Sequence, residues 1–225
     1  MVKYIIFDLD GTLVNSIYDL ADSVNFVLRQ NGYTEHPLDS FYYFIGNGTL
    51  KLIERALPQD KRTKEEIERV HSQFSDYYSK NYLNKTVAYD GINELLDELD
   101  RLKIKYAVAS NKTDIFTCQI IDKLFDNNFD AVVGKKDGNP TKPDPKIIYD
   151  ILEGKNLSSS EILFVGDSNI DIQTGHNAGI KAVGCLWGFR DEMELKEAGA
   201  DFIISHPSEL LRIINNLYDG KGENL

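Results

Sequence analysis

Two aspartates placed directly after an apolar run are the first residues whose types and spacing indicate chemistry. Residues 4–13 read YIIFDLDGTL, so Asp8 and Asp10 follow the run and are separated by one leucine. A buried strand that ends in two carboxylates brings them to the edge of a parallel sheet, where such sheets bind ligands. A single aspartate after a strand is more often a turn or capping residue, so the interpretation depends on the other strands.

Other apolar runs are also followed by polar residues that could take part in catalysis or ligand binding. They are Ser110, Asn111 and Lys112 at the end of run 106–110, Lys142 in the loop after run 129–133, and Asp167 and Asp171 after run 161–166. Clustered carboxylates repel each other and need a cation, and hard oxygen ligands suit Mg²⁺, which completes its shell with water and substrate phosphate. The set therefore predicts a magnesium site flanked by a hydroxyl and an ammonium group, which fits a phosphoryl group.

Short apolar runs predict the strands of a parallel sheet that is buried on both faces. The runs span residues 3–7, 106–110, 129–133, 161–166, 181–185 and 201–205. Amphipathic segments at 91–102, 114–125 and 144–153 predict helices between the later strands. This alternation indicates an α/β fold, a doubly wound parallel sheet of the Rossmann-like kind with right-handed crossovers.

The stretch between the first and second strands interrupts the alternation and predicts only helices. Residues 17–28 carry one apolar stripe at helical spacing, and Leu50, Ile53 and Leu57 form a second. Its length is about that of a small domain. The expected division is a catalytic core of residues 1–15 and 86–225 with an inserted helical-bundle cap domain of residues 16–85.

Composition excludes several classes of partner. The 225 residues include 36 acidic and 25 basic side chains, a net charge of −11, which disfavours nucleic acid and anionic membrane surfaces. Cys118 and Cys185 have no metal-ligand spacing and indicate reduced thiols. The first apolar run soon meets Asp8, unlike a signal peptide, and no run approaches the roughly 20 apolar residues of a bilayer span. We expect a soluble, cytoplasmic protein, monomeric or homodimeric, that binds neither nucleic acid nor membrane.

The motifs together resemble those of the haloacid dehalogenase-like hydrolase superfamily, in the branch whose helical cap is inserted after the first strand. DLDGT at 8–12 is similar to the first motif, DxDGT, and Ser110 to the second. Lys142 in KPDP is similar to the third motif, and GDSNID at 166–171 to the fourth. The resemblance extends over essentially the whole chain and implies the same fold, cap position and use of Mg²⁺.

The resemblance also implies a role for each matched residue. Asp8 is the implied nucleophile, which forms an aspartyl-phosphate, and Asp10 the general acid that later acts as base. The implied magnesium ligands are Asp8, the backbone carbonyl of Asp10 and Asp167, with Asp171 supporting them from behind. Lys142 offsets the charge of Asp8 and the phosphoryl group. The residues implied to bind phosphate are Thr12, Ser110, Asn111 and Lys142.

The predicted cap contains candidates for recognition of the leaving group. Gly46, Asn47 and Gly48 lie in the loop FIGNGT, where glycines suit close approach of the backbone to a ligand. Lys51 and Arg55 follow at helical spacing and are candidates for binding a substrate carboxylate. A plain turn and a solvated helix face are the alternative interpretations of these residues.

The expected activity is Mg²⁺-dependent hydrolysis of a small phosphate ester. Within the branch, the chain resembles phosphoglycolate phosphatases most in SNK (110–112), GNGTLKLIERAL (46–57) and WGFRDEMELKEAGADFII (187–204). Pyrophosphatases, nucleotidases and hexose-phosphate mutases share much of the pattern and remain alternatives. A non-enzymatic phospho-receiver or binding module is a remote one, because such a module has about half this length and no helical insertion.

Overall fold

Six parallel strands form the centre of the core in the computed structural model, which describes residues 1–218. In their order across the sheet, the strands are β5 (Ala131–Lys135), β4 (Lys105–Thr113), β1 (Tyr4–Phe7), β6 (Ile162–Gly166), β7 (Lys181–Cys185) and β8 (Phe202–Ile204). All neighbours pair in parallel, so their carboxyl ends share one edge of the sheet. The predicted α/β class is confirmed, and β1 lies between β4 and β6, which brings the residues after these strands together.

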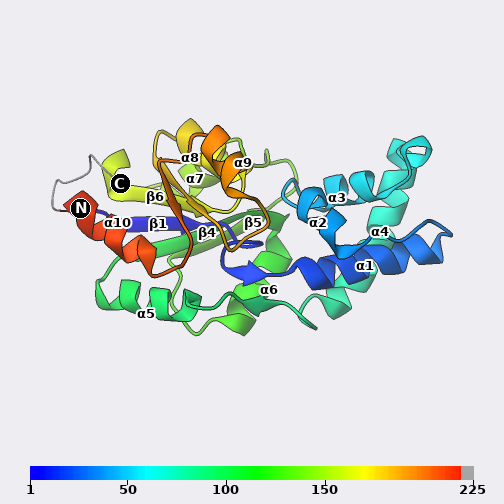
Figure 1. Cartoon of the computed structure of the whole chain (residues 1–225), viewed down its shortest axis with the longest axis horizontal. Coiled ribbons are helices and arrows are strands. Elements are labelled where there is room, and N and C mark those ends of the chain that lie inside the picture. The colour runs from blue at the N-terminus through cyan, green and yellow to red at the C-terminus, as the bar shows by residue number, and fades with distance from the viewer. Residues whose placement is uncertain (219–225) are drawn as a thin grey trace.

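Helices cover both faces of this sheet (Figure 1). The central strands β1 and β6 are buried along their whole length. Along β1, Ile5 and Phe7 pack in one apolar cluster, and Tyr4 and Ile6 pack in another. The helices that contribute to the first cluster are α5 (Ile92–Arg101), α6 (Asp114–Leu124) and α10 (Glu209–Tyr218). The helices on the opposite face are α7 (Lys146–Leu152), α8 (Asn169–Asn177) and α9 (Glu192–Glu197).

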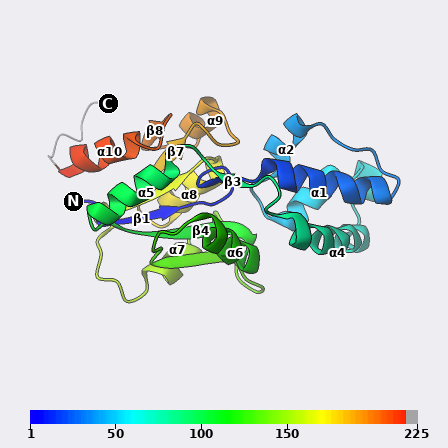
Figure 2. The same ribbon diagram turned by 90° about the horizontal axis from the view of Figure 1, so that it is seen from below.

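Four helices form a lobe beside the core, at the end of the molecule toward which β1 points (Figures 1 and 2). They are α1 (Ile17–Gln30), α2 (Leu38–Phe44), α3 (Thr49–Ala56) and α4 (Lys64–Asn81). The lobe has its own apolar centre, to which Val24, Phe41, Ile53 and Phe74 belong. The chain enters and leaves it through an antiparallel ribbon of β2 (Val14–Asn15) and β3 (Val87–Ala88). The two segments that connect the lobe to the core are therefore hydrogen-bonded to each other.

Two details differ from the sequence expectation. The predicted stripe of Leu50, Ile53 and Leu57 is wrong at Leu50, which is 52% exposed. Ile53 and Leu57 are buried, and α3 also buries Leu52 and Ala56. Strand β4 continues past Ser110 to Thr113, with an irregular register against β5. The sequence does not predict this extension because its residues are polar, although its side chains are buried up to Lys112.

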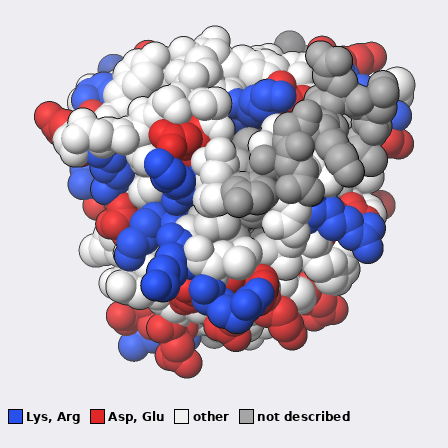
Figure 3. Space-filling view, turned by 90° about the vertical axis from the view of Figure 1, so that its left-hand side faces the viewer, with Lys and Arg blue, Asp and Glu red and all other residues white. Residues whose placement is uncertain are grey.

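The outer surface mixes charges of both signs. On the face of the core that points away from the lobe, basic and acidic side chains lie side by side among the residues that the structure describes (Figure 3).

Within residues 1–218, none of the helices is both long enough and apolar enough to span a membrane.

Candidate active site

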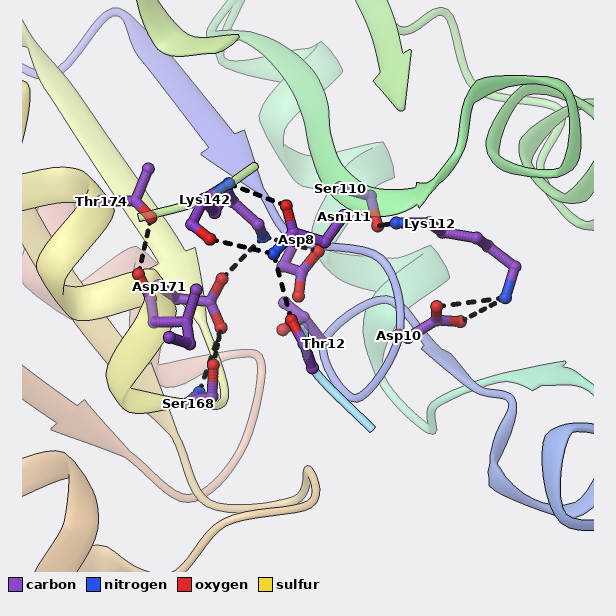
Figure 4. A network of polar contacts seen from close by, with 12 residues as sticks. Asp8, Asp10, Thr12, Ser110, Asn111, Lys112, Lys142, Ser168, Asp171 and Thr174 are labelled. Carbon is purple, nitrogen blue, oxygen red and sulfur yellow. Dashed lines mark hydrogen bonds and ion pairs between the residues drawn. The ribbon is translucent and has the colours of Figure 1, made fainter. Parts of the chain in front are cut away.

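Asp8 and Lys142 meet at the carboxyl edge of the sheet. Asp8 directly follows β1, and its Oδ1 lies 2.9 Å from the Lys142 ammonium. The same ammonium lies 2.7 Å from Oδ1 of Asp171, near the start of α8 (Figure 4). The Lys142 side chain is 1% exposed, so this cation is held between two carboxylates out of contact with bulk water. Burial lowers the pKa of Lys142, but Asp171 and Asp8 together outweigh burial and raise it, which keeps the ammonium charged.

Asp167, at the end of β6, completes the acidic cluster and is held by its surroundings. Its Oδ2 accepts a hydrogen bond of 2.7 Å from the Phe189 backbone N–H. A Cβ atom at Gly188 would lie 2.2 Å from the Cβ of Asp167, and one at Gly11 would lie 2.3 Å from its Oδ2. Gly11 also has a φ of +90°, so only glycine fits both the turn and the close contact.

The three carboxylates fit a hard divalent cation. One oxygen each of Asp8, Asp167 and Asp171 lies within 4.8 Å of the other two. Burial raises the pKa of Asp167, and Asp171 and Asp8 raise it further by repulsion. Burial also raises the pKa of Asp8 to about 7, against the opposing effect of Lys142. A cluster whose ionised form is this unfavourable on its own is stabilised by a cation, and oxygen ligands suit Mg²⁺.

A pH dependence of stability follows from the raised pKa of Asp8. The folded state keeps its proton up to about pH 7, whereas the unfolded state loses it near pH 4. Metal-free protein is therefore destabilised by this group progressively as pH rises through that window. We expect the unfolding free energy of Asp8→Asn, relative to that of wild type, to increase as the pH rises from 4 to 7. Urea denaturation in EDTA measures this difference. Equal pH slopes for the two proteins would contradict the assignment.

Asp10 points away from the acidic cluster, toward the lobe (Figure 4). Both of its carboxylate oxygens lie 3.1 Å from the Lys112 ammonium, and Ser16 donates a hydrogen bond of 2.5 Å to Oδ1. The Lys112 side chain is 1% exposed and lies 4.9 Å from the centre of the Tyr78 ring, which belongs to α4. The carboxylate of Asp10 is thus held at the boundary between core and lobe.

The residues expected to bind phosphate occupy different positions. Ser110 is buried at the end of the regular part of β4, beside the pocket described below. Asn111 uses its amide in structural bonds: Oδ1 accepts from the Lys142 backbone N–H at 2.8 Å, and Nδ2 donates to the carbonyls of Lys142 and Gly46. Thr12 is fully buried, and its hydroxyl lies 3.5 Å from Oδ1 of Asp167.

The residues of the lobe that were candidates for recognition of the leaving group also fall into two groups. Gly46 and Gly48 have positive φ values and line a pocket together with Asp8, Asp10 and Ser110. Asn47 and Arg55 bond to each other at 2.7 Å, and Arg55 also donates to the backbone carbonyls of Tyr43 and Phe44. Lys51 is paired with Glu54 at 2.8 Å on the exposed side of α3. The two glycines therefore face the pocket, while these three polar side chains bond within the lobe.

Arg190 connects the core to the lobe above this pocket. Its guanidinium donates to the carbonyl of Tyr42 in α2 and, at 2.8 Å, to that of Ile45 just after the helix. The preceding residue, Phe189, packs in the apolar centre of the lobe. The lobe is thus fastened over the carboxyl edge of the sheet.

Sequence reasoning did not assign roles to Lys112 or Arg190. The signal for Lys112 was its position two residues after Ser110, because alternate residues of a strand face the same side. That signal was lost when the strand was predicted to end at Ser110. Arg190 carries no such local signal, because its partners are main-chain carbonyls of a distant segment.

Comparisons with known proteins agree with this geometry. A sequence model of the haloacid dehalogenase-like hydrolases matches residues 5–185. A phosphoglycolate phosphatase from Haemophilus influenzae is 33% identical over 219 residues, 94% of this chain and 98% of the relative. Another, from Aquifex aeolicus, is 33% identical over 216 residues, 96% of this chain and 98% of the relative. The crystal structure of a predicted phosphoglycolate phosphatase from Haemophilus somnus superimposes with a TM-score of 0.86 at 30% identity, over 95% of this chain and 98% of that one. The chain is therefore a phosphatase and belongs to the haloacid dehalogenase-like hydrolase family.

Proposed function

We propose that the protein hydrolyses 2-phosphoglycolate, a small phosphate monoester, through an aspartyl-phosphate on Asp8. The observation that carries the proposal is the grouping of the Asp8 carboxylate with the Lys142 ammonium and two further acids, beside a pocket that Asp8 lines. The relatives named as phosphoglycolate phosphatases, which match nearly the full chain, support the choice of substrate.

Asp8 acts as the nucleophile in the first step. A carboxylate oxygen forms a bond to phosphorus while the bond between phosphorus and the ester oxygen breaks, and the leaving alkoxide takes a proton from Asp10. In the second step, water attacks phosphorus, Asp10 takes its proton, and the bond to Asp8 breaks to release inorganic phosphate. Covalent catalysis divides one difficult displacement into two easier ones.

Asp10 must move to carry out these proton transfers. Its carboxylate is held by Lys112 and Ser16, and it shares one pocket with Asp8. Gly11 follows it directly, and the turn at this residue supports a swing of Asp10 between a position on Lys112 and one near the ester oxygen.

The residues that would hold Mg²⁺ are Asp8, the backbone carbonyl of Asp10 and Asp167, with Asp171 placed behind them. The ion supplies positive charge that offsets the repulsion between the Asp8 carboxylate and a phosphate dianion. Lys142 supplies further positive charge at Asp8, and fixed charges in a site shielded from water are generally the largest contribution to catalysis.

The remaining assignments concern phosphate and the lobe. We propose that Ser110 and nearby backbone amides bind phosphate oxygens, that Asn111 fixes the loop carrying Lys142, and that Thr12 orients Asp167. We also propose that residues 16–85 act as a cap on a core of residues 1–15 and 86–225. The separate apolar centre of the lobe supports this division, and closure would exclude water from the site.

A substrate panel tests the proposal. We expect the highest kcat/KM for 2-phosphoglycolate among a set that includes pyrophosphate, nucleoside monophosphates and hexose phosphates, measured as release of phosphate with Mg²⁺. EDTA should reduce turnover by at least about 100-fold, because the acidic cluster is then left uncompensated. Undiminished turnover in EDTA would refute the metal assignment. A higher kcat/KM for pyrophosphate or a nucleotide, or isomerisation of a hexose phosphate without phosphate release, would refute the substrate.

A further inference from the structure

We infer that Lys112 binds the carboxylate of the leaving group and so selects phosphate esters whose alcohol carries a carboxylate next to the ester carbon. The inference rests on the proposed function, which supplies the phosphoryl position at Asp8. An anionic group that enters a site shielded from water must find a cation or several hydrogen-bond donors, because the loss of hydration is otherwise uncompensated.

The pocket beside Asp8 offers one cation for this purpose. Among the lining residues that the structure describes, Lys112 is the single lysine or arginine. Lys142 lies at the phosphoryl end, between Asp8 and Asp171. The cations of the lobe that the sequence suggested, Lys51 and Arg55, are bonded elsewhere.

The surroundings of Lys112 are already those of a carboxylate site. Its ammonium lies at equal distances, 3.1 Å, from the two oxygens of Asp10. The neighbouring wall is apolar and includes Leu20, Ile45 and Leu52 from the lobe, which strengthens an ion pair by lowering the local dielectric constant. The ammonium also lies over the face of the Tyr78 ring, 4.9 Å from the centre of the ring.

Asp10 therefore occupies the position that we assign to the substrate carboxylate. When the substrate carboxylate binds Lys112, it replaces Asp10 as the counter-ion, and the Asp10 side chain is released toward the ester oxygen, where the proton transfer takes place. An ester with a neutral alcohol cannot make this exchange and leaves Asp10 paired with Lys112. Specificity and positioning of the acid are then achieved by one lysine.

Two esters of matched size separate this role from general damage to the site. 2-Phosphoglycolate and 2-hydroxyethyl phosphate differ in a carboxylate against a hydroxymethyl group. We expect wild type to prefer 2-phosphoglycolate and expect Lys112→Met to reduce the ratio of the two kcat/KM values by about 50-fold, the usual loss for a hydrogen bond to a charged group. Damage to the site that affects both esters equally cancels in this ratio.

Three further variants complete the experiment. Lys112→Gln should reduce the ratio as Lys112→Met does and replaces that variant if it does not fold. Lys112→Arg should keep part of the preference, because it keeps the charge. Lys51→Met, which removes an exposed lysine of the lobe, should change neither kcat/KM value.

The outcomes distinguish the inference from the function beneath it. A wild-type preference for 2-phosphoglycolate that persists in Lys112→Met and Lys112→Gln overturns the role of Lys112 and leaves the proposed function intact. A wild-type enzyme that does not distinguish the two esters overturns the proposed substrate and this inference with it. A ratio that falls in Met and Gln and is partly kept in Arg supports both.

Discussion

Replacement of Asp8 by asparagine is expected to lower kcat for phosphate ester hydrolysis by at least about 10⁴-fold, as for other nucleophiles that act in covalent catalysis. An amide has nearly the shape of the carboxylate but is a very weak nucleophile. Acid-quenched wild type should carry one extra phosphoryl group by intact-mass spectrometry during turnover, and Asp8→Asn should carry none.

Asp22→Asn is the matched control for this variant. Asp22 is an exposed carboxylate of α1 that pairs with Lys85 on the surface, and its replacement should leave kcat unchanged. If Asp8→Asn kept more than about 1% of wild-type turnover, Asp8 would not be the nucleophile, because few enzymes retain that much without one.

Replacement of Lys142 by methionine is expected to affect both stability and turnover. The variant keeps the apolar stem but leaves Asp8 and Asp171 without their shared counter-ion, and breaking a buried pair in this way costs about 3 kcal/mol of unfolding free energy. The loss of a fixed charge at the phosphoryl group should also lower kcat by about 10³-fold. Urea denaturation and steady-state kinetics measure the two effects.

Lys146→Met provides the comparison for Lys142. Lys146 lies four residues further along and forms an exposed pair with Asp150 at 2.8 Å, so its loss should change stability by less than about 0.5 kcal/mol. With saturating Mg²⁺, the difference in unfolding free energy between Lys142→Met and Lys146→Met should become smaller, because the ion also offsets the charge of the cluster. The difference in kcat between the two variants should be larger with Mg²⁺ than without it. Equal stability and equal kcat for the two variants would contradict the account of Lys142.

The family, the fold class and the enzyme class were predictable because strong local patterns carry them. An apolar run ending in Asp8 and another ending in Asp167 are readable from sequence alone, and the geometry of parallel sheets brings such ends together. That rule predicts a shared edge of the sheet, and the acidic cluster forms there because β1 and β6 are neighbouring strands. The roles of its members stay predictions until the variants above are measured.

The lobe was less predictable because helical spacing gives the direction of a side chain but not its partner. Lys51 pairs with Glu54, three residues further along α3, which is an ordinary spacing for a surface ion pair. Arg55 donates to the carbonyl groups at the end of α2, and that pairing has no sequence pattern of its own. The role of Lys112 was missed for a related reason. Its polar neighbours resembled a loop, whereas the chain there continues as a strand whose polar groups are bonded to Asp10, Lys142 and the lobe.

Phe189 and Arg190, neighbours in the chain, make contacts with both the acidic cluster and the lobe. The backbone N–H of Phe189 holds a carboxylate oxygen of Asp167, and the guanidinium of Arg190 holds the end of α2. This two-residue segment therefore joins a carboxylate of the site to the lobe, and an outward swing of the lobe would have to break the hydrogen bonds of Arg190. Any such opening would be opposed by a residue outside the lining of the pocket, through a guanidinium bonded to the last turn of a seven-residue helix.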